Sequence, residues 1–103
     1  MDIIKRNGRK VLFNPQKLIK RLTAYPTEID LRNYIDRAVI NVQTFFYNGI
    51  TTKEIDERLA QCVSQLSIFE PEMAYLGGYI VITAIEKDLR LSSYNYLDNP
   101  VLL

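Results

Sequence analysis

The chain has 103 residues, which is enough for one compact domain with a modest core and too few for two. Its contents of 48% hydrophobic and 24% charged residues are ordinary for a soluble globular protein. The sequence contains no histidine, which excludes histidine ligands and a histidine general base. The single cysteine, Cys62, excludes an internal disulfide and leaves no basis for a structural zinc site.

The N-terminal stretch lacks the apolar core that a signal peptide carries. The longest apolar run, residues 79–85, is far shorter than the roughly 20 residues that cross a bilayer. We therefore expect a soluble, cytoplasmic protein without a membrane partner.

Charge is distributed unevenly along the chain, although the formal net charge is only +1. Residues 1–21 contain seven basic side chains and one acidic side chain, whereas residues 22–103 contain six basic and eleven acidic ones. One end of the domain therefore produces a positive local field beside an acidic remainder. This distribution favours a small anion held at one place over a long polyanion lying across the whole surface.

The first predicted element is a hairpin of residues 3–6 and 9–13, closed by a two-residue type I′ turn at Asn7-Gly8. In that register two pairs of basic residues face each other: Lys5 with Lys10, and Arg6 with Arg9. Like charges placed directly across a ladder repel one another. A sequence that tolerates both pairs is plausible if an anion neutralises them.

Two helices are predicted next. Asn14-Pro15 combines an N-cap residue with proline at the first helical position, which predicts a helix to about Thr23. Thr27 and Asp30 have the spacing of a capping box, which predicts a second helix over about 28–47. Its apolar residues recur every three or four positions, as on one buried face: Leu31, Ile35, Ala38, Val42 and Phe45.

The third helix is predicted to begin after Asn48-Gly49, because Thr51 and Glu54 form a capping box. Its predicted buried face contains Ile55, Leu59, Cys62, Val63 and Leu66, so Cys62 is interpreted as a core residue.

A fourth helix is predicted from Glu70-Pro71 to about Leu91. Its centre, residues 75–85, is apolar nearly all round, which indicates a helix packed on several sides. The competing interpretation is a buried strand over residues 79–83, because that segment is rich in β-branched residues. Gly77-Gly78 inside a helix costs about 1 kcal/mol per glycine relative to alanine, which predicts a close backbone neighbour. We expect the domain to end near residue 91, with 92–103 as a linker toward a missing catalytic domain or a tail that packs on a partner.

No catalytic constellation is recognisable in the sequence. It lacks both common glycine-rich phosphate loops, and no histidine is available to activate a serine or cysteine. The remaining candidate is an anion site, formed where the basic hairpin meets the helix starts at Asn14 and Thr51. The alternative is that these basic residues only solubilise the domain.

Four ordered blocks carry a family resemblance: IIKRNGRKVLFNPQKL at 3–18, YNGITTKEID at 47–56, PEMAYLGGYI at 71–80, and Lys87. Together they resemble the ATP-cone, a nucleotide-sensing domain at the N-terminus of many ribonucleotide reductase large subunits and of a bacterial repressor of reductase genes. The resemblance implies an α+β fold in which a small N-terminal β-hairpin or sheet caps a four-helix domain.

The resemblance also implies ATP or dATP, with Mg²⁺, between the cap and the helices. Eight positions match the family's nucleotide-binding residues: Lys5, Arg6, Val11, Asn14, Lys17, Thr52, Asp56 and Lys87. By motif position, Lys17, Thr52 and Lys87 match phosphate contacts, and residues 11–14 match the segment beside the base. Asp56 matches the position linked to telling ATP from dATP.

By this resemblance the chain is a non-catalytic allosteric module that controls the overall activity of a ribonucleoside-diphosphate reductase, through its oligomeric state. The implied partners are the nucleotide effector, the catalytic domain of the same polypeptide, other reductase subunits and, through the cone, a second copy. Two alternatives stay open. One is a nucleotide-sensing or nucleic-acid-binding repressor fragment, although we do not expect nucleic acid as a partner. The other is a degenerate cone that acts as a docking surface without ligand. The number of nucleotides and the preference for ATP or dATP also stay open.

Overall fold

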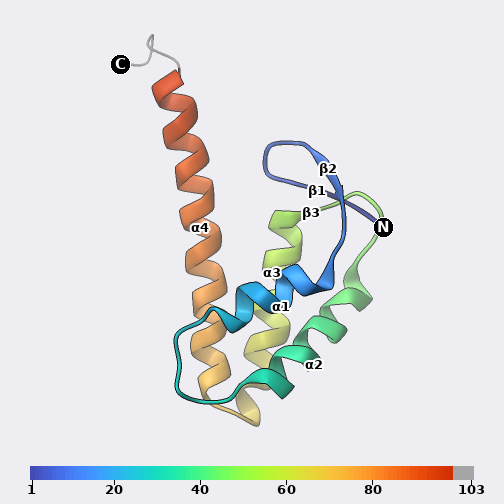
Figure 1. Cartoon of the computed structure of the whole chain (residues 1–103), viewed down its shortest axis with the longest axis vertical. Coiled ribbons are helices and arrows are strands. Elements are labelled where there is room, and N and C mark those ends of the chain that lie inside the picture. The colour runs from blue at the N-terminus through green and yellow to red at the C-terminus, as the bar shows by residue number, and fades with distance from the viewer. Residues whose placement is uncertain (99–103) are drawn as a thin grey trace.

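Three short strands and four α-helices make up the part of the chain that the structure describes (Figure 1). This computed structural model describes the backbone of residues 1–98 and the side chains of residues 1–90. The strands are β1 (Asp2–Ile4), β2 (Lys10–Leu12) and β3 (Ile50–Thr51), and the helices are α1 (Pro15–Thr23), α2 (Arg32–Val42), α3 (Thr52–Gln65) and α4 (Glu72–Asp98). The predicted α+β fold, helices capped by a small N-terminal sheet, is confirmed.

The hairpin forms, but its predicted turn and register are wrong. Ile3 pairs with Val11 and Ile4 with Lys10, one residue away from the expected register. The Lys5 N–H donates to the carbonyl oxygen of Arg9, and the Gly8 N–H donates to the carbonyl oxygen of Lys5, both at 2.8 Å.

The connection is therefore a three-residue loop, Arg6 to Gly8, in place of a type I′ turn. A loop of this length needs a positive φ at one residue, and Gly8 supplies it at 84°, whereas Asn7 does not adopt one. The expected facing pairs Lys5–Lys10 and Arg6–Arg9 are consequently wrong. Arg6 occupies the loop and can reach the helices.

Strand β3 is an element that the sequence analysis missed. It pairs in parallel with β1, with Ile3 beside Ile50 and Ile4 beside Thr51, so the strand order is β2-β1-β3. Two residues are too few to show an alternating pattern. Because β3 runs directly into α3, the pairing places the start of α3 beside the hairpin.

Capping residues place α1 and α3 as predicted. The Asn14 side chain accepts a hydrogen bond from the Gln16 N–H, and the Thr51 side chain accepts one from the Glu54 N–H. Both are donors that the first turn of a helix cannot satisfy internally. The starts predicted for these two helices are thus confirmed.

Helix α2 is shorter than the predicted 28–47 at both ends. The Thr27 hydroxyl accepts from the Ile29 N–H, and the Asp30 carboxylate accepts from the Arg32 N–H, both at 3.1 Å. Each is a local turn across two residues, so the expected capping box does not form. At the other end the chain tightens into a short 3₁₀ helix, Gln43–Phe45, in which Phe45 is 49% exposed.

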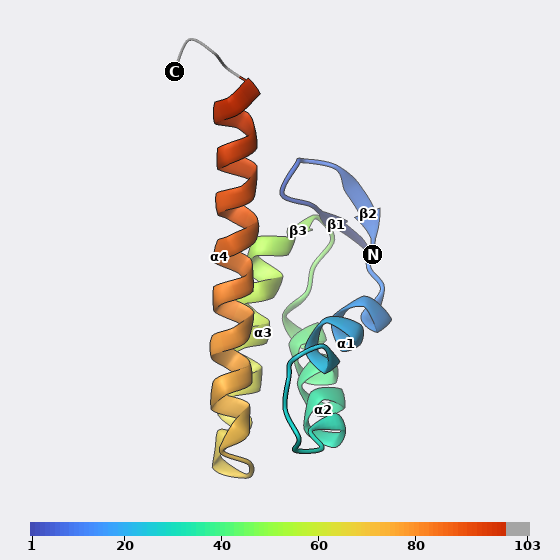
Figure 2. The same ribbon diagram turned by 60° about the vertical axis from the view of Figure 1, so that its left-hand side comes forward.

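Helices α3 and α4 lie antiparallel, with α1 and α2 beside them, and the sheet covers one end of this group (Figure 2). The core consists of side chains from all four helices, among them Leu22, Ile35, Val42, Leu59, Val63, Leu76 and Ile80. Cys62 is buried in it as predicted, and burial raises the pKa of its thiol. None of the helices in the described part of the chain is long and apolar enough to cross a membrane.

Residues 79–83 are helical, so the strand alternative is wrong. A close neighbour explains one of the two glycines: a Cβ on Gly77 would lie 2.3 Å from the Ser64 hydroxyl of α3, whereas one on Gly78 would meet nothing within 4 Å.

The composition of α4 predicted a helix packed on several sides, and this prediction is wrong. Four apolar residues are more than half exposed: Tyr75, Ile82, Ile85 and Leu89. The helix also continues to Asp98, past the end expected near Leu91. Of the linker or tail predicted over 92–103, residues 92–98 have a helical backbone, and residues 99–103 lie outside the described part of the chain.

Candidate functional site

A hollow of about 470 Å³ lies between the hairpin, α1, the start of α3 and the outer part of α4. All eight predicted site residues line it: Lys5, Arg6, Val11, Asn14, Lys17, Thr52, Asp56 and Lys87. They come from four separate segments of the chain. The hollow is of the size that small-ligand sites typically have.

The two kinds of side chain in this hollow suit a ligand with an anionic and an apolar part. Its basic residues come from the hairpin, α1 and α4, and Asp56 is the one acidic residue among its lining residues. Apolar side chains complete the wall: Ile3, Val11, Leu12, Phe13, Leu18 and Ile55. An excess of cations in a concave site focuses a positive potential on whatever binds there.

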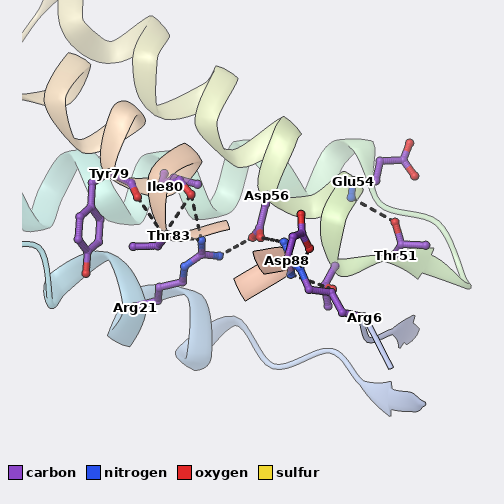
Figure 3. Close-up of polar contacts among 10 residues, drawn as sticks. Arg6, Arg21, Thr51, Glu54, Asp56, Tyr79, Ile80, Thr83 and Asp88 are labelled. Atoms are coloured by element: carbon purple, nitrogen blue, oxygen red, sulfur yellow. Dashed lines mark hydrogen bonds and ion pairs between the residues drawn. The ribbon is translucent and has the colours of Figure 1, made fainter. Parts of the chain in front are cut away.

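Asp56 is the acceptor at the centre of the site (Figure 3). It is only 5% exposed, whereas the other two acids of α3 are half-buried (Glu54) and exposed (Glu57). Its Oδ2 accepts from Arg6 Nη2 at 3.0 Å, and its Oδ1 accepts from Arg21 Nη1. The two guanidinium groups compensate the cost of holding this carboxylate away from water.

Arg6 reaches from the hairpin loop to two more groups. Its Nε donates to Asp88 Oδ1 at 2.6 Å and its Nη1 donates to the Thr52 hydroxyl at 3.3 Å. Burial opposes the charge of Arg6, but its hydrogen bonds to Asp88 and then to Asp56 outweigh that effect, so its pKa is raised. Arg6, which was predicted to contact the nucleotide, is therefore already bound to carboxylates of the protein itself.

Arg21 is a site residue that the sequence analysis missed. Besides Asp56, it donates from Nη2 to the Thr83 hydroxyl at 3.0 Å and to the Ile80 carbonyl oxygen at 3.3 Å (Figure 3). It is four residues after Lys17 on α1, hence on the same helix face, and that spacing is the signal that could have found it. Arg21 joins α1, α3 and α4 at one point.

Lys87 contributes to the wall of the hollow from α4. Burial lowers the pKa of its ammonium group; Arg21, Arg6 and Lys5 lower it further, and Asp56 partly compensates. An anion placed among these cations would remove that mutual repulsion.

No group of three metal-ligating side chains occurs within the described residues. The groups of this hollow that suit an anion are its basic side chains and the backbone N–H groups at the start of α3.

A family model, the ATP cone domain, matches residues 1–88. The chain belongs to the ATP-cone family. Similar proteins include the ribonucleoside-diphosphate reductase large chain 2 of Saccharomyces cerevisiae, 30% identical over an alignment of 92 residues that covers 84% of this chain and 10% of that protein.

The ribonucleoside-diphosphate reductase large subunit from Caenorhabditis elegans is 24% identical over an alignment of 87 residues that covers 82% of this chain and 11% of that subunit. The large chain from Neurospora crassa is 24% identical over 92 residues, covering 87% and 10% respectively. The chain thus spans about a tenth of the length of the curated relatives it matches.

Proposed function

We propose that this ATP-cone is a non-catalytic allosteric module that binds ATP or dATP and controls the overall activity of a cytoplasmic ribonucleoside-diphosphate reductase. The observation that carries the proposal is the hollow itself. It gathers five basic side chains and an apolar wall from four segments, in a chain whose family is named for ATP.

The lining residues suggest how the nucleotide lies. Lys5, Arg6, Lys17 and Lys87 would contact the phosphates, together with the hydroxyl of Thr52 at the start of α3. The base would lie beside residues 11–14, where Val11 and Phe13 provide apolar surface and Asn14 a polar group. In this arrangement the phosphates contact the basic side chains of the hollow, and the base contacts its apolar wall.

Asp56 would distinguish the two nucleotides, because a carboxylate oxygen accepts a hydrogen bond from a sugar hydroxyl that dATP lacks. One hydroxyl is expected to change the free energy of binding by about 1–3 kcal/mol. Allostery requires the two ligands to stabilise different states by different amounts, and a difference of this size is sufficient.

Mg²⁺ would arrive with the nucleotide. Asp56 is the one carboxylate that lines the hollow, and two arginines already bind its oxygens. Mg²⁺ is commonly held largely by substrate phosphates and water, so it does not require a carboxylate cage.

The partners would be the catalytic domain of the same polypeptide, other reductase subunits and a second copy of the cone. Tyr75, Ile82 and Leu89 on α4 are exposed at seven-residue spacing, with Ile85 between them. Such an exposed apolar stripe is the seam that a second helix covers in a coiled coil. ATP and dATP would then change which assembly is favoured, and so the reductase activity.

Calorimetric titration of the chain with ATP and with dATP tests the proposal. We expect heat from both nucleotides, and we expect Lys17→Ala to weaken binding by about tenfold, since a hydrogen bond to a charged group contributes about 1.5–3 kcal/mol. Lys20→Ala is the matched control, because Lys20 lies on the same helix and outside the hollow. Absence of heat in folded protein would refute the proposal and favour a cone that docks without ligand.

A further inference from the structure

Arg6 is bound by three groups of the protein: Asp56 and Thr52 of α3, and Asp88 of α4. It is also a lining residue of the hollow, whereas Asp88 is not. Asp88 lies on the other side of the guanidinium, beside the start of α3. The same side chain thus faces the ligand site on one side and an α4 carboxylate on the other.

The two carboxylates differ in how easily they release Arg6. The Asp56 side chain is 7% exposed and is also paired with Arg21, so losing Arg6 would leave a buried charge less well neutralised. The Asp88 side chain is 48% exposed, so water can solvate it once Arg6 leaves. An incoming anion therefore displaces Asp88 more readily than Asp56.

We propose that Asp88 is a positioning residue that sets nucleotide affinity by competing with the ligand's phosphates for Arg6. The inference rests on the proposed function and names a regulatory contact of the same site. When an anion occupies the hollow, Arg6 turns toward it from Asp88, and the polar link between the hairpin loop and α4 opens. Occupancy is thereby transmitted to α4, the helix that carries the exposed apolar stripe.

The test compares ATP affinity of the folded chain with and without the Asp88 carboxylate. Asp88→Ala should tighten ATP binding by about two- to fivefold, because an exposed ion pair is worth about 1 kcal/mol or less. Glu86→Ala is the matched control: it removes the same charge from the same helix, at an exposed residue that does not line the hollow. It should change the affinity less than twofold.

A second background separates competition from a general effect on the fold. Arg6→Lys keeps the cation but loses the fork that reaches Asp56 and Asp88 together. In Arg6→Lys protein, adding Asp88→Ala should give no more gain than adding Glu86→Ala. Asp88→Asn, which keeps a neutral acceptor, should give part of the gain and serves if the alanine variant folds poorly.

Three results would overturn the inference. Equal ATP affinities for the Asp88 and Glu86 variants would show that only net charge matters. A full gain from Asp88→Ala in the Arg6→Lys background would show that the effect does not pass through Arg6. If folded wild-type chain releases no heat with ATP, the proposed function fails, and the competition inferred here fails with it.

Discussion

The two sides of α4 have similar amino-acid composition and very different surroundings. The inner side contributes Met73, Leu76 and Ile80 to the core, each fully buried, and Ile80 also offers its carbonyl oxygen to Arg21. The outer side exposes Tyr75 and Ile82, along with Ile85 and Leu89, to solvent. In both views α4 stands at the edge of the domain, with its neighbours on one side (Figures 1 and 2).

This contrast shows that the apolar content of a helix does not report how much of the helix is covered. A helix that is apolar all round is expected to be buried all round. Here the side that carries Tyr75, Ile82, Ile85 and Leu89 is left open, which is typical of a surface that binds a partner. Three predictions test the contrast between the two sides, from the largest effect to the smallest.

Replacing isoleucines on opposite sides of α4 should give the largest difference. Ile80→Ala removes a fully buried side chain and leaves a cavity, so it should lower the free energy of unfolding by about 2–5 kcal/mol. Ile82→Ala, at a side chain 58% exposed, should change it by less than about 0.5 kcal/mol. Urea denaturation of both variants measures the difference. Similar losses would mean that the outer side is covered in the isolated chain.

Replacement by alanine should stabilise the chain at Gly78 but not at the adjacent Gly77. Gly78→Ala faces open space and should stabilise the chain by about 1 kcal/mol, because alanine is the better helix former. Gly77→Ala should gain little or nothing, since its new Cβ would lie 2.3 Å from the Ser64 hydroxyl. Adding Ser64→Ala should recover the missing gain. Thermal melting of the three variants checks this, and an equal gain at both glycines would contradict the close approach to α3.

The smallest effect is expected at Lys87, whose charge is opposed first by burial and then by the neighbouring cations. Its pKa is lowered in the folded chain from the ordinary 10.5, so the unfolded chain binds more protons at pH values between the two. The stability of the wild type therefore rises with pH across that window. Lys87→Met lacks this rise.

We accordingly expect the stability of Lys87→Met relative to wild type to be highest near pH 7 and to decline as the pH approaches 10.5. Denaturation curves at several pH values measure the difference, with Lys20→Met as the control for loss of a lysine outside the hollow. A difference that does not change with pH would contradict the lowered pKa of Lys87. Lys87→Met should also weaken ATP binding, because it removes a positive charge from the lining of the hollow.

Local chemistry made much of the fold predictable. Asn14-Pro15 and Thr51 place the starts of α1 and α3, because an N-cap satisfies backbone donors within two or three residues of itself. The buried stripe of α3 followed from its spacing, and every expected member of it is buried. By contrast, Thr27 and Asp30 satisfied nearby donors without starting a helix, since the same side chains also stabilise turns.

The order of the motif blocks along the chain allowed eight site residues to be named, and all of them line one hollow. Three neighbours were not predictable in the same way. Arg21, Thr83 and Asp88 become part of the site only because α1 and α4 approach α3 at Asp56. No local pattern marks Thr83 or Asp88, since the arginines they contact lie 62 and 82 positions away. Arg21 differs from them in one respect, because it shares a helix face with Lys17.

The sequence by itself determined the starts of α1 and α3, the basic N-terminal segment and membership of the ATP-cone family, because each of these depends on residues close together or on the order of motifs along the chain. The tertiary structure decided the hairpin register, the parallel pairing of β3, the burial of Asp56 between two arginines and the open side of α4. These depend on long-range contacts, in which a shift of one residue moved Arg6 from a strand into the loop that reaches Asp56 and Asp88.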